Sequence, residues 1–444
     1  MQDTVLIIDD EKKLCSLLAR IIGLEGFTVF TAHTGKEGLN ILRTEDIYVV
    51  LSDVKLPDIN GVEMVKEIKK IKPYTEVINL TAFGTIQDGV MSMRNGAFDY
   101  IIKGDDNDKI IPLLYKAMEK AKQNLRLYAM EAKIVEQHNF NSILGESDVI
   151  KTAIQLARKV SATDTTTLLL GETGTGKEVF AQAIHYEGDR KLKPFVAVNC
   201  SSFSAELLES ELFGYKAGAF TGAVKDKKGL IEEANGGTLF LDEIGEMNLI
   251  LQAKFLRVLE SQTYIKVGDT LTSKVNVRII AATNRDLKKE AEEGKFRLDL
   301  YYRLSVFSIE LPPLAQRKGD VQLIANHFLK QFTAKVNKPA FIMDKEFIQH
   351  LNTHGWKGNI RELKNVMERV VILADNNTIS SNLLPYEFHS ELSSDGSEPM
   401  NMHTIEKLHI SKVLKFTNGN KTETARLLGI GLTTLYRKLE EYSL

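Results

Sequence analysis

Residues 165–178 read TTTLLLGETGTGKE, and this stretch decides the central fold. It places the frame G-x-x-x-x-G-K directly after a strand-like run and before a segment that can form a helix. In such a loop the backbone N–H groups turn onto phosphate oxygens, the helix dipole adds attraction, and the lysine reaches the terminal phosphates. The frame predicts a nucleotide-phosphate loop made of Gly171, Glu172, Thr173, Gly174, Thr175, Gly176, Lys177 and Glu178.

The stretch GGTLFLDEIGE at residues 236–246 supplies the second element that a nucleotide site needs. An apolar run ends there in two carboxylates, as a buried strand does when it reaches a sheet edge. Asp242 can hold Mg²⁺ directly or through water, and Glu243 can polarise the attacking water. This pair, downstream of the phosphate loop, predicts a site that binds ATP with Mg²⁺ and hydrolyses it.

A hexapeptide of high specificity lies between these two elements. Residues 211–223 read ELFGYKAGAFTGA, and taken alone the end of this stretch is a surface loop with an exposed Phe. In this position, however, it resembles the NtrC-like AAA+ activators of sigma-54 RNA polymerase, and the resemblance extends from Phe140 to Leu384. It implies an AAA+ P-loop α/β domain with a helical lid, in which a glutamate such as Glu178 is usual. It also implies that sigma-54 is contacted by Gly218, Ala219, Phe220, Thr221, Gly222 and Ala223.

The same resemblance implies roles for polar residues at the ends of other strands. Asn199 would hold Glu243 away from water until the site is ready, and Thr283 with Asn284 would sense the γ-phosphate. A hydroxyl or amide at such a position can detect a phosphate through hydrogen bonds.

Three arginines complete the ATPase that the resemblance implies. Arg297 and Arg303 would be arginine fingers that act on the ATP of a neighbouring subunit, and Arg361 in the lid would touch the nucleotide. The alternative for Arg297 and Arg303 is a solvated helix face with ordinary ion pairs. Lys357 replaces a proline that is usual in the family, which is expected to loosen the lid.

The first 103 residues alternate short apolar runs with helix-like stretches, which predicts a doubly wound α/β domain. The expected strands are residues 5–8, 48–52, 77–80 and 100–102. Asp9 and Asp10 follow the strand at 5–8, and Asp53 follows the strand at 48–52, which is the third strand of the expected domain. Their carboxylates should therefore meet at the edge where such sheets bind ligands. Clustered carboxylates there suit Mg²⁺ and leave one oxygen able to attack phosphorus.

The joint pattern DDE, SDVKLPDING, LTAFG and FDYIIKG resembles the response-regulator receiver family over about 120 residues. The resemblance implies that Asp53 accepts a phosphoryl group from a sensor histidine kinase. It further implies that Mg²⁺ is bound by Asp9, Asp10 and the carbonyl of Lys55, that Thr81 and Lys103 sense the phosphoryl group, and that Tyr100 is an aromatic switch. Gly104 departs from the proline that usually follows the lysine.

Residues 104–137 predict one long helix. Apolar residues recur there with 3-4 spacing, which favours a two-stranded coiled coil with a second copy of the chain. The alternative is an amphipathic helix packed on its own domain. The recurring positions are Ile111, Leu114, Met118, Ala121, Leu125, Tyr128, Ala132 and Val135.

The last 42 residues, 403–444, have a local charge of +3 from seven Lys/Arg and four Glu, whereas the whole chain has −2. They predict helix, Gly429 turn, and a second helix over 432–442, which resembles the Fis-type helix-turn-helix that often ends NtrC-like proteins. The alternative is a plain helical hairpin. In a double-stranded DNA complex Thr433, Thr434 and Arg437 would face the bases and Lys438 a phosphate. Gly431 and Leu432 replace a usual Ser-Arg, which predicts a weaker contact per monomer.

Composition adds the cellular setting. Two distant cysteines fit a reducing compartment, and no apolar run is long enough to span a membrane, so we expect a cytoplasmic protein. The expected parts are a receiver (1–121), a linker helix that overlaps its end (104–137), the ATPase (138–385), a flexible linker (386–402) and a DNA-binding domain (403–444).

The resulting hypothesis is a phosphorylation-controlled activator that assembles into a ring, expected to be a hexamer, and uses ATP to remodel sigma-54 RNA polymerase. Two rivals stay open at this point. One is a DNA-binding repressor or co-regulator with a vestigial ATPase. The other is an AAA+ remodeller of a different protein client.

Overall fold

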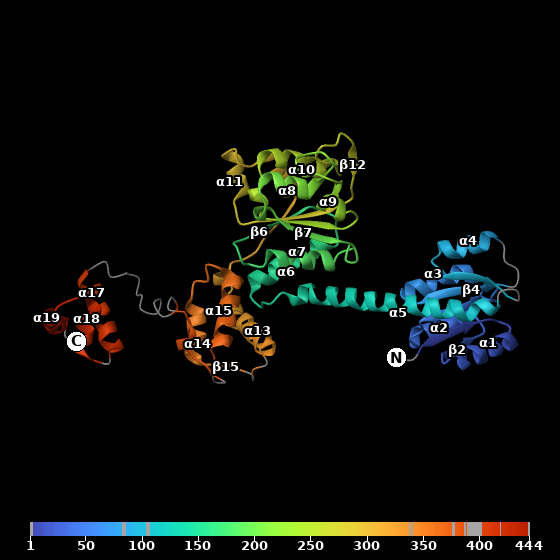
Figure 1. Cartoon of the computed structure of the whole chain (residues 1–444), viewed down its shortest axis with the longest axis horizontal. Coiled ribbons are helices and arrows are strands. Elements are labelled where there is room, and N and C mark those ends of the chain that lie inside the picture. Colours follow the sequence, from blue (N-terminus) through green and yellow to red (C-terminus); the bar gives the residue numbers. More distant parts are fainter. Residues whose placement is uncertain are drawn as a thin grey trace. The chain divides into compact units, whose positions relative to one another are not determined.

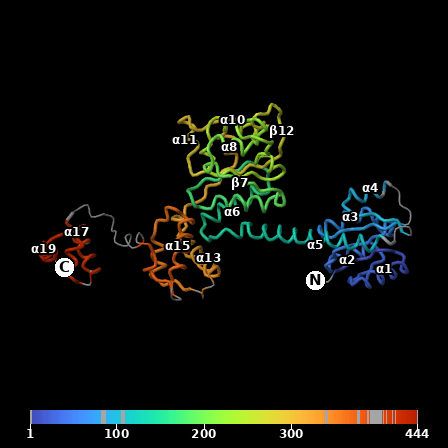
Figure 2. The backbone as a smooth tube through the Cα atoms, viewed as in Figure 1, coloured from blue at the N-terminus to red at the C-terminus, as the bar shows by residue number. Residues whose placement is uncertain are grey.

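The computed structural model describes residues 3–81, 86–103, 107–336, 338, 341–374, 378–385, 388, 402–417 and 419–442. Gly104 and most of the predicted linker 386–402 lie outside these residues. The chain divides into two compact units, Met1–Ser142 and Ile143–Leu444, and each is described by itself. Figure 1 labels their elements and Figure 2 traces the backbone of each.

The first unit is a five-stranded parallel sheet with the strand order β2-β1-β3-β4-β5. Its strands are β1 (Thr4–Ile8), β2 (Thr28–Ala32), β3 (Val49–Asp53), β4 (Glu76–Thr81) and β5 (Asp99–Ile102). Its helices are α1 (Lys12–Leu24), α2 (Gly35–Thr44), α3 (Gly61–Ile71), α4 (Ile86–Arg94) and α5 (Asn107–Gln137). The expected doubly wound fold is therefore confirmed, with β2 as a strand that the apolar-run analysis missed.

Helices cover both faces of this sheet. Val5 and Ile7 pack with α1 and α5 in one core, whereas Leu6 and Ile8 pack with α2 and α3 in the other. Because neighbouring residues of a strand point to opposite faces, a continuous apolar run is needed when both faces are buried. This alternation explains why residues 5–8 read as an unbroken hydrophobic stretch.

Helix α5 is one continuous helix of 31 residues. The first part of its predicted seam, Leu114, Met118 and Ala121, is buried in the core of the first unit. Further along the helix the seam residues Tyr128 and Ala132 are exposed, as are Met130 and Ile134 beside them. The packing of α5 on its own domain therefore accounts for the first half of the seam, and pairing with a second copy stays a prediction for the second half.

The second unit begins with a parallel sheet whose strand order is β14-β6-β13-β10-β7. Its strands are β6 (Thr167–Leu170), β7 (Phe195–Asn199), β10 (Thr238–Asp242), β13 (Arg278–Thr283) and β14 (Phe307–Glu310). Its helices are α6 (Asp148–Ser161), α7 (Lys177–Tyr186), α8 (Ala205–Phe213), α9 (Leu230–Glu233), α10 (Leu249–Ser261), α11 (Leu287–Glu292) and α12 (Leu298–Leu304). Two small hairpins pair β8 (Gly214–Tyr215) with β9 (Lys227–Lys228) and β11 (Thr263–Ile265) with β12 (Thr272–Lys274).

A helical lid follows, made of α13 (Asp320–Lys335), α14 (Lys345–Thr353) and α15 (Asn359–Leu373). The expected helical lid also contains two short strands, because β15 (Ile342–Met343) pairs with β16 (Thr378–Ile379). These strands are too short to show a period in the sequence. The lid has its own core, in which Trp356 is fully buried and donates from Nε1 to the carbonyl of Leu351 at 2.8 Å.

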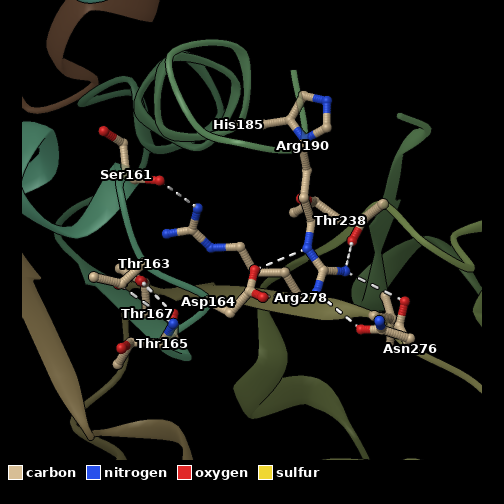
Figure 3. A network of polar contacts seen from close by, with 12 residues as sticks. Ser161, Thr163, Asp164, Thr165, Thr167, His185, Arg190, Thr238, Asn276 and Arg278 are labelled. Atoms are coloured by element: carbon tan, nitrogen blue, oxygen red, sulfur yellow. Dashed lines mark hydrogen bonds and ion pairs between the residues drawn. The ribbon is translucent and has the colours of Figure 1, made fainter. Parts of the chain in front are cut away.

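A polar network fixes the edge of the second sheet that lies opposite the carboxyl ends of its strands (Figure 3). Arg278 at the start of β13 donates to the carbonyls of Val160 and Ser161, at 2.8 and 3.1 Å. Arg190 pairs with Asp164 through two nitrogens, at 2.8 and 3.0 Å. Arg278 thus joins β13 to the end of α6, and Arg190 joins the loop after α7 to the segment after α6. Both groups hold helices and sheet together through charge-assisted hydrogen bonds.

His185 in this network titrates in an unusual range (Figure 3). Burial lowers its pKa to about 4, and its ring nitrogens lie 2.9 Å from Thr238 Oγ1 and 3.1 Å from the carbonyl of Lys193. The unfolded chain therefore binds the extra proton first as the pH falls. The neutral histidine contributes stability that is complete above about pH 6.5 and is lost as the pH falls toward 4.

We expect this histidine to remove about 2 kcal/mol from the stability of the second unit between pH 7 and pH 5. His185→Gln keeps an amide that can serve the same partners but cannot take up the proton. Calorimetry of the full chain at both pH values measures the effect, as the difference between wild type and variant. An equal loss of stability in both proteins would contradict the prediction.

The C-terminal segment has three helices, α17 (Met402–Phe416), α18 (Lys421–Leu428) and α19 (Leu432–Tyr442). Ala425 and Leu435 meet in their core, and Gly429 ends α18 in the left-handed conformation with φ 64°. The predicted second helix over 432–442 is confirmed. Within the described part of the chain, no helix is both long and apolar enough to cross a membrane.

Candidate functional site

The carboxyl edge of the first sheet gathers the predicted acidic residues. Ligand oxygens of Asp9, Asp10 and Asp53 all lie within 4.8 Å of one another. Lys103 Nζ lies 2.8 Å from Asp9 Oδ2 and 3.2 Å from Asp53 Oδ2. Three carboxylates at this spacing are a hard oxygen donor set, so they fit the Mg²⁺ that such a site would need.

Burial and charge oppose each other at the candidate phosphoacceptor. Burial raises the pKa of Asp53, while the charge and hydrogen bond of Lys103 act in the opposite direction. Burial also tends to lower the pKa of Lys103, but Asp9 and Asp53 outweigh it and the pKa is raised. The ammonium therefore stays charged beside the carboxylate and can bind the oxygens of an incoming phosphoryl group.

The other predicted receiver residues surround this edge. Thr81 is the last residue of β4, is buried, and accepts from the backbone N–H of Lys103 through its carbonyl at 2.7 Å. Tyr100 packs its ring over Gly89 of α4, where a β-carbon would lie 3.5 Å from the ring. Lys55 bridges to Asn60 in the loop after β3. Their roles in binding Mg²⁺ and in signalling stay predictions.

The phosphate loop joins β6 to α7 as the motif requires. Lys177 begins α7, is buried, and donates to the carbonyls of Gly171 and Glu172 at 2.9 and 3.3 Å. Its Nζ also lies 3.7 Å from Glu243 Oε1. A buried ammonium between the loop and an acidic pair lies where a terminal phosphate would be bound.

Asp242 and Glu243 end β10 next to this lysine. Burial raises the pKa of Asp242, and the charge of Lys177 partly offsets the effect. Glu243 has a left-handed backbone with φ 52°, which turns it away from the strand direction. The two neighbouring carboxylates therefore point in different directions, and their roles toward Mg²⁺ and the attacking water stay predictions.

Asn284 lies between the phosphate loop and Glu243. Its Nδ2 donates to Thr173 Oγ1 at 3.2 Å, and its backbone N–H donates to Glu243 Oε2 at 3.4 Å. Thr283 is buried and accepts from the N–H of Arg285 at 3.0 Å. This arrangement brings the predicted sensor residues to the site.

Asn199 differs from the expectation in its contacts. It is in register with Asp242 on the adjacent strand, but its Oδ1 accepts from the N–H and hydroxyl of Ser201 at 2.9 and 2.7 Å. The hydrogen bonds described for its side chain are thus with Ser201 rather than with Glu243. A restraint of Glu243 by Asn199 stays a prediction.

The two candidate arginine fingers lie at either end of α12. Arg297 caps the helix and forms a two-point pair with Asp299, at 3.1 and 2.7 Å, while its side chain stays 41% exposed. Arg303 donates to the carbonyl of Leu259 at 3.4 Å. An exposed ion pair such as Arg297–Asp299 contributes little to stability. The guanidinium of Arg297 could therefore leave Asp299 and bind a phosphate instead.

A cavity of about 850 Å³ opens beside Arg297. It lies between α10 and the β11–β12 hairpin, and Leu249 and Ile250 on its rim are exposed apolar side chains. Exposed apolar surface next to a candidate arginine finger is typical of a protein–protein contact.

The GAFTGA segment folds into a tight loop. Gly218 donates its N–H to the carbonyl of Ala223 at 2.8 Å, and Gly218 and Gly222 have φ of 83° and 107°, which favour glycine. Phe220 is 45% exposed and packs edge-on against Tyr215 at 4.9 Å between ring centroids. The loop therefore presents Phe220 and the exposed Thr221 to solvent.

Sequence reasoning missed the β11–β12 hairpin, which supports this loop. Val267 donates to the carbonyl of Gly214 at 2.9 Å and accepts from Lys216 at 3.0 Å. A β-carbon on Gly268 would lie 2.6 Å from that of Ala219. The signal was a Gly-Asp turn between two short strand-like runs, which is a recognisable hairpin pattern.

One predicted DNA-contact residue has partners within the chain. Lys438 is turned inward, with its Nζ 2.6 Å from Glu406 Oε2 and 3.2 Å from the Tyr442 hydroxyl, and its side chain is 18% exposed. Without DNA it thus joins α17 to α19 through a charge-assisted hydrogen bond. Its contact with a DNA phosphate stays a prediction. Thr433 and Arg437 are exposed on α19 and Thr434 is half-buried.

Comparisons with known sequences identify the domains in which these residues lie. The profile described as "Response regulator receiver domain" matches residues 5–115, "Sigma-54 interaction domain" 143–310, "AAA+ ATPase lid domain" 315–400, and "Bacterial regulatory protein, Fis family" 402–442. The regulatory protein AtoC of Escherichia coli K12 is 38% identical over 450 residues, covering 99% of this chain and 98% of its own.

The chain belongs to the NtrC-like family of sigma-54-dependent response regulators.

This NtrC-like regulator is also similar to the transcriptional regulatory protein GlrR of Escherichia coli K12, at 40% identity over 99% of the chain and 97% of GlrR. Among solved structures, NtrX from Brucella abortus in complex with ATP is 31% identical, with a TM-score of 0.63 and complete coverage of both chains. The NtrC-like regulator therefore combines a receiver, an ATPase that binds nucleotide, and a Fis-type DNA-binding domain.

Proposed function

We propose that phosphorylation of Asp53 controls the assembly of the ATPase into a ring that remodels sigma-54 RNA polymerase. One observation carries the proposal. Lys177 lies beside Glu243 in the phosphate site, whereas Arg297 is exposed and paired with Asp299 instead of pointing into that site. Such a subunit holds the nucleotide-binding half of a site and offers the other half to a neighbour.

In the receiver, Asp9 and Asp10 would hold Mg²⁺ together with Asp53 and the carbonyl of Lys55. The ion would neutralise phosphoryl oxygens while Asp53 attacks phosphorus. Lys103 and Thr81 would then bind the new phosphoryl oxygens, and movement of these two residues would reach Tyr100 and α4. A sensor histidine kinase is the expected donor.

Signalling to the ATPase is proposed to run through α5 as part of a dimer. The exposed residues Leu127, Met130 and Ile134 leave apolar surface on the helix beyond the receiver core. Burying it in a second copy is favourable, since each apolar side chain removed from water contributes about 1–2 kcal/mol. The proposed relay has five parts: the receiver (1–121), the linker helix (104–137), the ATPase (138–385), the flexible linker (386–402) and the DNA-binding domain (403–444).

In the ring, Lys177 and the loop from Gly171 to Glu178 would bind the phosphates of ATP, and Asp242 would hold Mg²⁺. Glu243 would orient and activate the attacking water, and Asn199 would hold Glu243 away from water until the site is ready. Thr283 and Asn284 would sense the γ-phosphate. The neighbour would contribute Arg297, with Arg303 as the second candidate. The subunit that binds this ATP would also cover the cavity beside the neighbour's Arg297.

The energy of hydrolysis is proposed to move the GAFTGA loop against sigma-54 at a promoter. Phe220 and Thr221 would make the contact, and the Fis-type domain would hold the ring near the promoter through Thr433, Thr434 and Arg437. Because several copies bind neighbouring sites, a weak contact per monomer still gives a high effective concentration.

Thr221→Ala tests the loop assignment. We expect sigma-54-dependent transcription in vitro to fall by about tenfold or more, because a contact residue at the loop tip is removed, while ATP hydrolysis stays within about twofold. Thr152→Ala, an exposed threonine on α6, is the matched control. Undiminished transcription by Thr221→Ala would refute the assignment. A pull-down that compares sigma-54 polymerase with sigma-70 polymerase would show whether sigma-54 is the preferred client.

A further inference from the structure

The turn that starts the lid helix α15 contains an unusual residue. Asn359 is completely buried and has a left-handed backbone with φ 53°. An asparagine tolerates this conformation better than most residues, but its amide must find partners when it is buried. The partners of this side chain therefore indicate why an asparagine stands there.

The carboxamide of Asn359 uses both of its N–H groups and its oxygen. Nδ2 donates to Glu172 Oε2 at 2.9 Å and to the carbonyl of Thr173 at 3.2 Å. Oδ1 accepts from the N–H of Leu314 at 2.7 Å. One side chain thus links three segments that are distant in sequence: the phosphate loop, the connection into the lid, and the lid helix.

Backbone contacts bring the same segments together. The N–H of Ile360 donates to the carbonyl of Gly174 at 3.0 Å. A β-carbon on Gly174 would lie 2.4 Å from the carbonyl oxygen of Gly358 and 3.1 Å from Cβ of Arg361, so only glycine permits this approach. The first turn of α15 therefore rests directly on the phosphate loop.

We propose that Asn359 is a positioning residue of the ATPase: its carboxamide fixes the first turn of α15 on the phosphate loop and so sets the place of Arg361 at the nucleotide. The inference rests on the proposed contact of Arg361 with ATP. Arg361 lies only two residues further along the helix, so a rotation of this turn moves its guanidinium. Small displacements of an aligned charge have large effects on binding.

The test uses the full chain and measures KM for ATP and kcat. Asn359→Gly permits the same backbone conformation but removes the carboxamide, and it should raise KM about tenfold with kcat within about threefold. Asn359→Asp should raise KM about a hundredfold, since a carboxylate would face Glu172 and the Thr173 carbonyl. Asn365→Ala, on an exposed residue of the same helix, should keep the wild-type KM.

A swap of donor and acceptor separates positioning from general destabilisation. In Glu172→Gln/Asn359→Asp the new amide of residue 172 can donate to the new carboxylate, so KM should recover about tenfold relative to Asn359→Asp, judged against Glu172→Gln alone. A variant that was merely misfolded would not recover. Absence of recovery, or a wild-type KM for Asn359→Gly, would overturn the inference.

A double-mutant cycle tests whether Asn359 acts through Arg361. Once Arg361→Ala has removed the guanidinium, adding Asn359→Gly should change KM by less than about threefold. Fully additive effects would overturn the inference while leaving the role of Arg361 intact. If Arg361→Ala itself had no effect on KM or kcat, the proposed role of Arg361 would fail, and the inference with it.

Discussion

Glu243→Gln is expected to slow ATP hydrolysis by about 10²–10⁴-fold while ATP binding stays within about threefold of wild type. In the wild-type structure the backbone nitrogen of Asn284 lies 3.4 Å from Glu243 Oε2. Gln keeps the size of the side chain and an oxygen that can accept this hydrogen bond. It loses the charge that orients and activates water. Single-turnover hydrolysis together with equilibrium ATP binding separates the two effects.

Glu246→Gln is the matched control for this prediction. Glu246 is a carboxylate of the same turn, but it pairs with Arg285 at the surface instead of facing Lys177. Its substitution should leave hydrolysis within about twofold of wild type, as usual for an exposed ion pair. Hydrolysis by Glu243→Gln within tenfold of the wild-type rate would show that another group activates the water.

Arg297→Ala is expected to reduce kcat by about 10³-fold, since charge supplied to the transferring phosphoryl group is worth at least that much. The two-point pair with Asp299 is the contact that would be exchanged. Asp299→Asn, which weakens the competing pair, should retain activity. Arg303 donates to the Leu259 carbonyl in this structure. The kcat of Arg303→Ala shows whether its guanidinium contributes to hydrolysis as much as that of Arg297.

Mixing two inactive variants decides whether Arg297 acts across an interface. In an equal mixture of Arg297→Ala and Glu243→Gln subunits, about a quarter of the interfaces combine an intact Glu243 with an intact Arg297 from the neighbour. We expect hydrolysis to return in proportion. If Arg297 acted within its own subunit, the mixture would be as inactive as its components, and hydrolysis by a pure monomer at the assembled rate would contradict the shared site.

Two of the strands that the sequence predicted, at residues 5–8 and 77–80, are almost wholly apolar, because helices cover both sides of β1 and β4. Asn79 is the one polar residue of these two runs. Strand β2 escaped because its side chains are mostly only partly buried and it has no unbroken apolar run. The sequence alone predicted that Asp9, Asp10 and Asp53 lie close together. Residues at the carboxyl ends of adjacent parallel strands meet at the same edge of the sheet.

Contacts that depend on tertiary packing could not be predicted in this way. Lys438 looked like a phosphate ligand on an exposed helix, but its partner Glu406 lies on α17 and comes close only after folding. Asn359 and Glu172 are separated by 187 residues. Nothing in the local pattern of either segment marks them as neighbours.

The single tryptophan of the chain, Trp356, makes the lid visible to spectroscopy. Its indole stacks edge-on against His354 at 4.8 Å between ring centroids, and it lies three residues before Asn359. Tryptophan emission, excited at wavelengths where the 13 tyrosines do not absorb, therefore reports on this turn alone. A stopped-flow mixing experiment with nucleotide would record how fast the lid responds, with no dye attached to the molecule.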